Sequence, residues 1–219
     1  MNVWLDFLIT SLAFGATFIY GSTGEILTEK AGHLNLGIPG IMCMGGAGGC
    51  LILNMIGGTC NQPHPGPDAE KRVRSYLERG GSILLLHGSS AAFWQWDWWR
   101  RLPGERWVRP NDPDGVASST HPRRPYTVRV SKSRHLLTSR LKEMELPEDE
   151  IYINLENTCP CMRLMETHIE EGTFVQCCEA ATPWGGKLIS FIPGHKPEVT
   201  ADPVLIANIV TLIDHLLEK

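Results

Sequence analysis

The sequence lacks an excess of positive charge: it holds 20 Lys and Arg against 24 Asp and Glu, a net charge of −4 over 219 residues. A general nucleic-acid-binding protein usually has a basic face and a high isoelectric point, so we expect no nucleic-acid partner. The 22 Gly and 15 Pro follow no period, which excludes a collagen-like chain. The length fits one large domain or two small ones and is sufficient to bury a core.

Charge is also scarce within the first sixty residues. The charged residues there are Asp6, Glu25, Glu29 and Lys30. Two uncharged stretches, 7–24 and 34–67, surround the last three of them. An 18-residue helix spans about 27 Å, close to the hydrocarbon thickness of a bilayer. The pattern predicts a hydrophobic helical hairpin over residues 1–58, either inserted in a membrane or buried in a soluble protein.

The N-terminus also lacks the signs of a secretory signal peptide, because no basic segment precedes the apolar run and no A-x-A site follows it. Lys30 is the one nearby basic residue, so charge does not define a membrane orientation. In the second stretch, Gly45 and Gly49 have the GxxxG spacing that permits close helix packing in lipid.

The polar segment between the two stretches carries a motif that resembles the N-terminus of sugar and nucleoside ABC transporter permeases. The matching residues are Glu25, Glu29, Lys30, Gly32, Asn35, Gly37 and Gly40. The resemblance covers residues 1–57, which is only the beginning of such a permease. It implies a membrane component that could not transport anything alone.

The composition changes after residue 58. Residues 59–67 are rich in Pro and predict a linker. Residues 69–79 predict an amphipathic helix that ends at Gly80 and Gly81. Residues 82–86 are apolar and predict a strand buried on both faces. This order is typical of an open parallel α/β sheet over residues 68–219.

Further segments extend this pattern. Residues 126–131, 163–167, 174–178 and 188–192 predict strands. Asp202 and Pro203 predict the start of a final helix that runs to about residue 217, with Asp202 as N-cap and a broad apolar face.

Five Trp occur between residues 94 and 107. Three interpretations stay open: packing in a core, a flat surface for carbohydrate, and anchoring at a membrane interface.

Motifs in residues 68–219 resemble, in order and spacing, those of ThuA-like domains, a family associated with trehalose utilisation. The matching residues are Gly80, Gly81, His87, Gly88, Phe93, Trp94, His135, Thr138, Asp149, Glu150, Tyr152, Trp184, Lys187, Gly194 and His195. The resemblance implies a flavodoxin-like fold related to class I glutamine amidotransferases and a role in sugar catabolism.

The family normally opens with βαβ units before the Gly-Gly strand, and residues 1–60 stand in their place here. The expected fold class is therefore α/β, a truncated flavodoxin-like parallel sheet with flanking helices that follows the hydrophobic hairpin.

His87 and His195 lie at predicted strand ends, where open α/β sheets bind ligands. His87, Glu150 and His195 are the candidate catalytic residues, because His and carboxylate groups exchange protons near neutral pH. The candidate substrate-binding residues are Gly88, Ser89, Trp94 and His121. The alternative is that the histidines only bond to backbone.

No metal ligand is assigned, and the cofactor is left open, although such groups can also hold Zn²⁺. The seven Cys include the close pairs Cys159/Cys161 and Cys177/Cys178, which lack the usual C-x-x-C spacing of zinc sites. Their odd number points to reduced thiols in a cytosolic protein. His87, rather than a Cys, follows the strand at 82–86, so an enzyme here would not use a Cys nucleophile.

The function expected for residues 68–219 is a role in the utilisation of trehalose-type sugars, with a sugar or sugar derivative as the small-molecule partner. The alternatives are a membrane component derived from a permease and a gene fusion with neither activity intact. The protein is expected at a membrane, with a cytoplasmic C-terminal domain, if residues 1–58 insert, and otherwise in the cytoplasm.

Overall fold

The structure is a computed structural model that describes residues 67–218. By its internal contacts the chain divides into two units, residues 1–49 and 50–219, and the described residues all belong to the second. The expected hydrophobic hairpin, the permease-like motif and linker residues 59–66 lie outside the described residues. Between residues 67 and 218, no helix is long and apolar enough to cross a bilayer.

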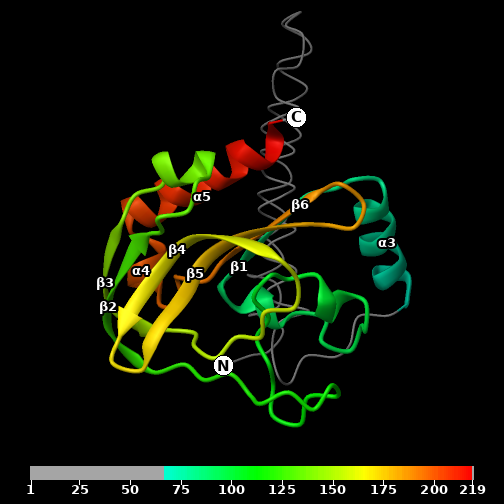
Figure 1. Ribbon diagram of the computed structural model, residues 1–219, viewed down its shortest axis with the longest axis horizontal. Helices are drawn as coiled ribbons and strands as arrows, with labels where there is room; N and C mark the ends of the chain where they lie inside the picture. The colour runs from blue at the N-terminus through cyan, green and yellow to red at the C-terminus, as the bar shows by residue number, and fades with distance from the viewer. Residues whose placement is uncertain (1–66, 219) are drawn as a thin grey trace, which may run out of the picture. The chain divides into compact units, whose positions relative to one another are not determined.

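The centre of the described region is a six-stranded sheet with the strand order β1-β6-β5-β4-β2-β3. Its strands are β1 (Ile83–Leu86), β2 (Arg123–Val130), β3 (Met144–Glu150), β4 (Cys161–Ile169), β5 (Gly172–Ala181) and β6 (Lys187–Phe191). All four segments predicted as strands beyond β1 overlap these elements. Figure 1 shows β4 and β5 side by side as a long hairpin.

The prediction of a parallel sheet is correct only for β1 and β6, which are parallel neighbours. All other strand pairs of this sheet are antiparallel. For the β4/β5 and β5/β6 pairs the reason is a short connection: only Glu170 and Glu171 separate β4 from β5, and residues 182–186 separate β5 from β6. Such hairpins force antiparallel pairing, since a parallel pair needs a long crossover. The fold is therefore mixed α/β.

The helices flank this sheet, with α5 across one side of it in Figure 1 and α3 near the β1 end. They are α3 (Pro67–Glu78), α4 (Pro197–Thr200) and α5 (Pro203–Leu217), with short 3₁₀ helices η2 (His87–Ala91), η3 (Trp99–Arg101) and η4 (Leu136–Ser139). The predicted cap of α5 is confirmed, because the Asp202 carboxylate accepts hydrogen bonds from the N–H groups of Val204 and Leu205.

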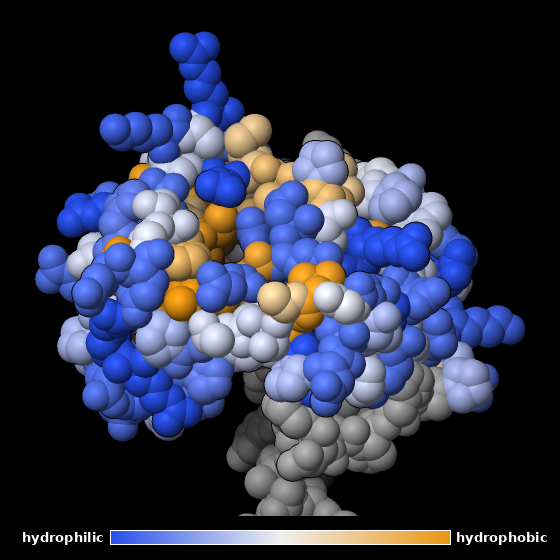
Figure 2. Space-filling view, turned by 60° about the horizontal axis from the view of Figure 1, so that its bottom comes forward, coloured by the Kyte–Doolittle hydropathy of each residue, from blue (hydrophilic) through white to orange (hydrophobic). Residues whose placement is uncertain are grey.

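Alternate residues of β1 enter two different cores. Leu84 belongs to a core with Leu205 and Leu212 of α5, whereas Leu85 belongs to a core with Leu77 of α3 and Trp99. Successive side chains of a strand point to opposite faces, so β1 is buried on both sides, as its apolar run predicts. On the face seen in Figure 2, apolar side chains show only as patches between hydrophilic ones.

The end of α3 and the start of β6 touch through glycines. Gly80 has a φ of +80° and its N–H bonds to the Leu77 carbonyl, which closes the helix as the Gly-Gly pair predicts. A Cβ atom on Gly186 would lie 2.2 Å from the Gly81 carbonyl oxygen. A Cβ atom on Gly81 would instead lie 2.4 Å from the Tyr76 ring, so neither position has room for a side chain.

Candidate functional site

His87 follows β1 directly, at the first position of η2, with a φ of 42°. Its Nδ1 lies 2.8 Å from the carbonyl oxygen of Ile192, at the end of neighbouring β6. A carbonyl oxygen can only accept, so Nδ1 carries the proton and donates. In the neutral ring, Nε2 therefore presents a lone pair. The side chain is 9% exposed, and Nε2 has no hydrogen-bond partner among the described residues.

Glu150 ends β3, and its two carboxylate oxygens face different groups. Oε1 accepts a hydrogen bond from Arg123 Nη2 at 2.5 Å and lies 3.5 Å from His121 Nδ1. Oε2 lies 3.5 Å from His87 Nε2 and 3.6 Å from His195 Nδ1. We call His87, Glu150 and His195 the His–Glu–His centre.

The neighbours of Glu150 favour the ionised form of its carboxyl group. The adjoining His87 ring, and then the Arg123 guanidinium, lower the pKa of Glu150 to about 2, against burial, which would raise it. The 3.5 Å separation from His87 is longer than a charge-assisted hydrogen bond of about 2.8 Å. Oε1 therefore has the direct hydrogen bond, from Arg123, and Oε2 has the longer contact with His87.

His195 lies just beyond β6, and its ring is 46% side-chain exposed. Its backbone is fixed by Asp149, a fully buried carboxylate that accepts hydrogen bonds from the N–H groups of His195 and Lys196 at 2.9 and 3.0 Å. The preceding Gly194, with a φ of 111°, supplies a backbone conformation that other residues rarely adopt. The loop therefore holds His195 opposite His87, with ring centroids 5.2 Å apart.

Aromatic rings border the His–Glu–His centre. The Tyr152 ring lies 4.4 Å from the His87 ring and 4.3 Å from the Trp107 ring, centroid to centroid. The exposed His121 ring lies 5.5 Å from Trp107. Trp and Tyr present a flat apolar face beside a polar edge, which suits the C–H and O–H faces of a sugar.

The other predicted substrate-binding residues are placed differently. Gly88 and Ser89 are buried in η2 beside His87, and the Ser89 hydroxyl has no hydrogen-bond partner within residues 67–218. The Trp94 ring instead lies under the Arg109 guanidinium, 5.4 Å away. The expected role of Trp94 in substrate binding stays a prediction.

Core packing accounts for part of the Trp cluster. Trp96 and Trp99 are buried in the second core, where the Trp96 ring stacks on Phe93 with 4.0 Å between centroids. The sugar interpretation suits Trp107, which lies next to Tyr152. Core packing is thus confirmed for Trp96 and Trp99, and the sugar and membrane-interface interpretations stay predictions.

The sequence analysis did not name three neighbours of the site as site residues: Arg123, Trp107 and Tyr152. Tyr152 has a local signal, because it stands two positions after Glu150 in the motif shared with ThuA-like domains. Arg123 has none, since its place follows from the register of β2 against β3, which pairs it with Glu150.

A second group of similar composition lies elsewhere and consists of His135, Glu179 and His215. Here His215 Nε2 is hydrogen-bonded to Glu179 Oε2 at 2.7 Å, and His135 Nδ1 accepts the Leu137 N–H. His135 Nε2 therefore carries the proton in the neutral ring. The direct hydrogen bond between His215 and Glu179 joins α5 to β5, and His135 lies beside it at the start of η4.

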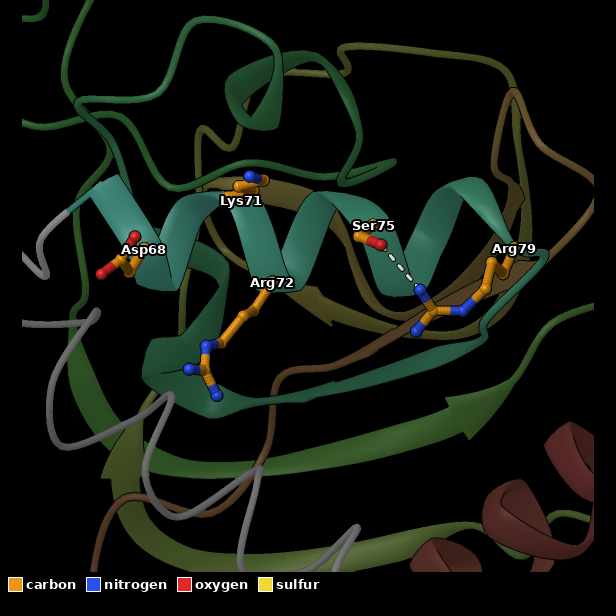
Figure 3. A pocket seen from close by; sticks show the side chains of 5 residues that line it. All are labelled: Asp68, Lys71, Arg72, Ser75 and Arg79. Atoms are coloured by element: carbon orange, nitrogen blue, oxygen red, sulfur yellow. Dashed lines mark hydrogen bonds between the residues drawn. The ribbon is translucent and has the colours of Figure 1, made fainter.

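Two hollows lie on the surface of the described residues. Figure 3 shows one of about 440 Å³, whose described lining residues come from α3 and from Arg79, which directly follows it. They are Asp68, Lys71, Arg72, Ser75 and Arg79. Arg79 donates a hydrogen bond to Ser75 along this helix face, and no buried polar group of the described residues points into it. The other hollow, of about 170 Å³, is bordered by Tyr152, but none of His87, Glu150 and His195 lines it.

The described cysteines lie apart from the His–Glu–His centre. Cys159, Cys161, Cys177 and Cys178 are all free thiols. Burial raises the pKa of the Cys177 thiol well above its usual range. The position after β1 is His87, so the arrangement of a glutamine amidotransferase, with a Cys at that turn, does not occur there.

Comparison with known proteins supports the fold and the family. The chain resembles a solved ThuA-like protein from Parabacteroides merdae (14% identity, TM-score 0.55), with 70% of this chain and 65% of that chain covered. A ThuA-like protein from Bacteroides uniformis gives 18% identity and a TM-score of 0.53, with 71% and 66% covered. The chain therefore spans about two thirds of the length of these structures.

No functionally curated protein matches the chain. The sequence model described as "ThuA: Trehalose utilisation" matches residues 53–211, which is most of the chain. The motifs around His87, Glu150 and His195 all lie within that match. The chain belongs to the ThuA family.

Proposed function

We propose that residues 68–219 act on a sugar derivative, with the reacting group of the sugar at the His–Glu–His centre. The family description points to trehalose utilisation at the level of the family. The observation that carries the proposal is the unpartnered Nε2 of His87, a buried ring nitrogen aimed at an ionised carboxylate. Such a nitrogen is available for chemistry because nothing in the fold of the described residues occupies it.

The aromatic rings define how the sugar would lie. Trp107 and Tyr152 offer flat faces for the C–H surface of a sugar ring, next to the exposed His121. Arg123, whose side chain is 54% exposed, adds N–H donors for sugar oxygens. A hydroxyl held on these rings would reach the centre, whose nitrogens and carboxylate can withdraw its proton.

The test is conversion of trehalose and its derivatives by the purified full-length chain, followed by NMR. We expect His195→Ala and Glu150→Gln to lower the rate at least about 100-fold, the usual contribution of a positioned proton-transfer group. His168→Ala is the matched control, because this histidine lies exposed on β4 and bonds to Thr173. Unchanged rates in both His87→Ala and His195→Ala would refute the proposal.

Binding without conversion would reduce the proposal to a sugar-binding domain. In that case Trp107→Ala should weaken binding, whereas Glu150→Gln should leave it nearly unchanged. No observation favours the alternative of a permease-derived membrane component, whose residues lie outside the described part of the chain. The location of the protein stays a prediction, and cell fractionation is its test.

A further inference from the structure

The contact between His87 and Glu150 requires a positively charged species between the two side chains. The neutral His87 ring directs a lone pair at Glu150 Oε2, because its single proton is donated from Nδ1 to Ile192. In its carboxylate form, Glu150 has only acceptor lone pairs on Oε2. Two lone pairs that face each other at 3.5 Å in a buried site repel unless a positive species lies between them.

The spacing of the three polar atoms matches the edges of a metal coordination shell. With bonds of 2.0–2.2 Å, two ligands of a tetrahedral Zn²⁺ ion stand about 3.4 Å apart. Oε2 of Glu150 lies 3.5 Å from His87 Nε2 and 3.6 Å from His195 Nδ1. The three ligand atoms all lie within 4.8 Å of one another. A bridging proton instead would draw His87 Nε2 to about 2.8 Å from the oxygen.

A neighbouring residue positions each of these three groups, as is usual for metal ligands in proteins. A ligating His usually donates its other N–H to a backbone carbonyl, as His87 does to Ile192. A ligating carboxylate is usually hydrogen-bonded on its second oxygen, as Glu150 Oε1 is by Arg123. Asp149 fixes the backbone of the third group, His195.

We propose that His87 Nε2, His195 Nδ1 and Glu150 Oε2 bind one divalent transition-metal ion of the Zn²⁺ class. Two imidazole nitrogens and one carboxylate oxygen form the His₂Glu set of catalytic zinc sites, which leave a fourth position for water or substrate. Metal binding itself does not depend on the proposed function. One consequence does rest on it: a sugar oxygen would occupy this fourth position. The ion would polarise that oxygen as a Lewis acid.

The His135–Glu179–His215 group provides an internal control. It has the same residue types, but His215 Nε2 bonds to Glu179 directly and His135 Nδ1 accepts a backbone N–H, which leaves His215 Nδ1 without a hydrogen-bond partner among the described residues. An ion ligated by His135 Nε2 would have to displace the remaining proton of that ring. Metal binding is therefore expected at the first group and not at the second.

The experiment is a titration of the chelator-treated, full-length chain with Zn²⁺ alone, measured by calorimetry. We expect one tightly bound equivalent in the wild type. His195→Ala and His87→Ala should each lower the affinity at least 100-fold, and His135→Ala should not change it. Because His195 lies on an exposed loop, His195→Ala tests the site even if the buried His87→Ala variant fails to fold.

Binding of Co²⁺ in place of Zn²⁺ distinguishes metal binding at this site from binding by the cysteines. Tetrahedral Co²⁺ shows visible d–d bands, and we expect them without the near-ultraviolet charge-transfer band that a thiolate ligand adds. A thiolate band, the absence of tight binding in the wild type, or binding that survives His195→Ala but not His135→Ala would overturn the inference. Metal binding without sugar conversion would refute the proposed function alone, and conversion without metal binding would refute the metal site alone.

Discussion

The carboxylate of Asp149 accepts a hydrogen bond from the backbone N–H of His195 at 2.9 Å, across 46 positions of the chain. Its other oxygen accepts the N–H of Lys196. One fully buried side chain on β3 thereby fixes the loop after β6 and places a histidine beside Glu150, its own neighbour in sequence. Asp149 is thus a positioning residue.

Asp149→Ala should destabilise the fold by about 3 kcal/mol, since it removes two charge-assisted hydrogen bonds and leaves two N–H groups without acceptors. Urea unfolding of the full-length chain measures this difference. The control is Glu148→Ala, which removes an exposed ion pair with Lys196 and should cost less than about 1 kcal/mol. Equal losses in the two variants would contradict the role of Asp149.

Glu105 should make stability depend on pH. It is 6% exposed, and burial raises the pKa of its carboxyl, against the charge of Arg163 and the hydrogen bond of Asn157. The folded state then holds the proton more tightly than the unfolded state, so stability is lost as the pH rises through the unfolded and then the folded pKa.

Glu105→Gln should remove this dependence and unfold at higher temperature than the wild type at neutral pH, with little difference at low pH. Melting curves between about pH 4 and pH 8 cover the window in which the carboxyl ionises. If the melting temperatures of the two proteins changed with pH in the same way, Glu105 would ionise as readily in the folded as in the unfolded chain.

Cys161 should be the most reactive of the four described thiols. A hydrogen bond with Cys178 lowers the pKa of Cys161, whereas burial raises the pKa of Cys159. The thiolate is the nucleophile, so brief treatment with iodoacetamide near neutral pH should label Cys161 first, as mass spectrometry of peptides would show. Labelling of Cys159 ahead of Cys161 would contradict this order, and Cys161→Ser identifies the labelled peptide.

Gly186→Ala should be strongly destabilising, because its Cβ atom would lie 2.2 Å from the Gly81 carbonyl oxygen. Backbone atoms cannot move aside as a flexible side chain can, and we expect a loss of about 3 kcal/mol or more in urea unfolding. Gly115→Ala is the control: its φ of +72° strains an alanine, yet no atom lies within 4 Å of the new methyl group. It should cost only about 1 kcal/mol.

Much of the local structure could be predicted from the sequence, because its signals are local. The Gly-Gly pair ends α3 at Gly80, and the apolar run at 83–86 forms a strand buried on both faces. Asp202 caps α5 as its type and position indicate. Each of these features depends on residues within a few positions of one another.

The direction of the strands could not be predicted in the same way. The run at 188–192 has the composition of a strand buried in a parallel sheet, and β6 does run parallel to β1. Its other neighbour, β5, is antiparallel, because residues 182–186 close a hairpin between the two strands. An apolar pattern indicates how deeply a strand is buried, whereas pairing depends on the whole path of the chain.

The apolar runs that precede His87 and His195 could be recognised in the sequence, as could Glu150 as a polar candidate, whereas the strand β3 that ends at Glu150 was not predicted. Only the tertiary structure decided how these groups face one another. The register of β2 against β3 places Arg123 on one oxygen of Glu150, and the Ile192 carbonyl turns the free nitrogen of His87 toward the other. These contacts join segments that are far apart in the sequence, so no local sequence pattern indicates which oxygen of Glu150 each residue faces.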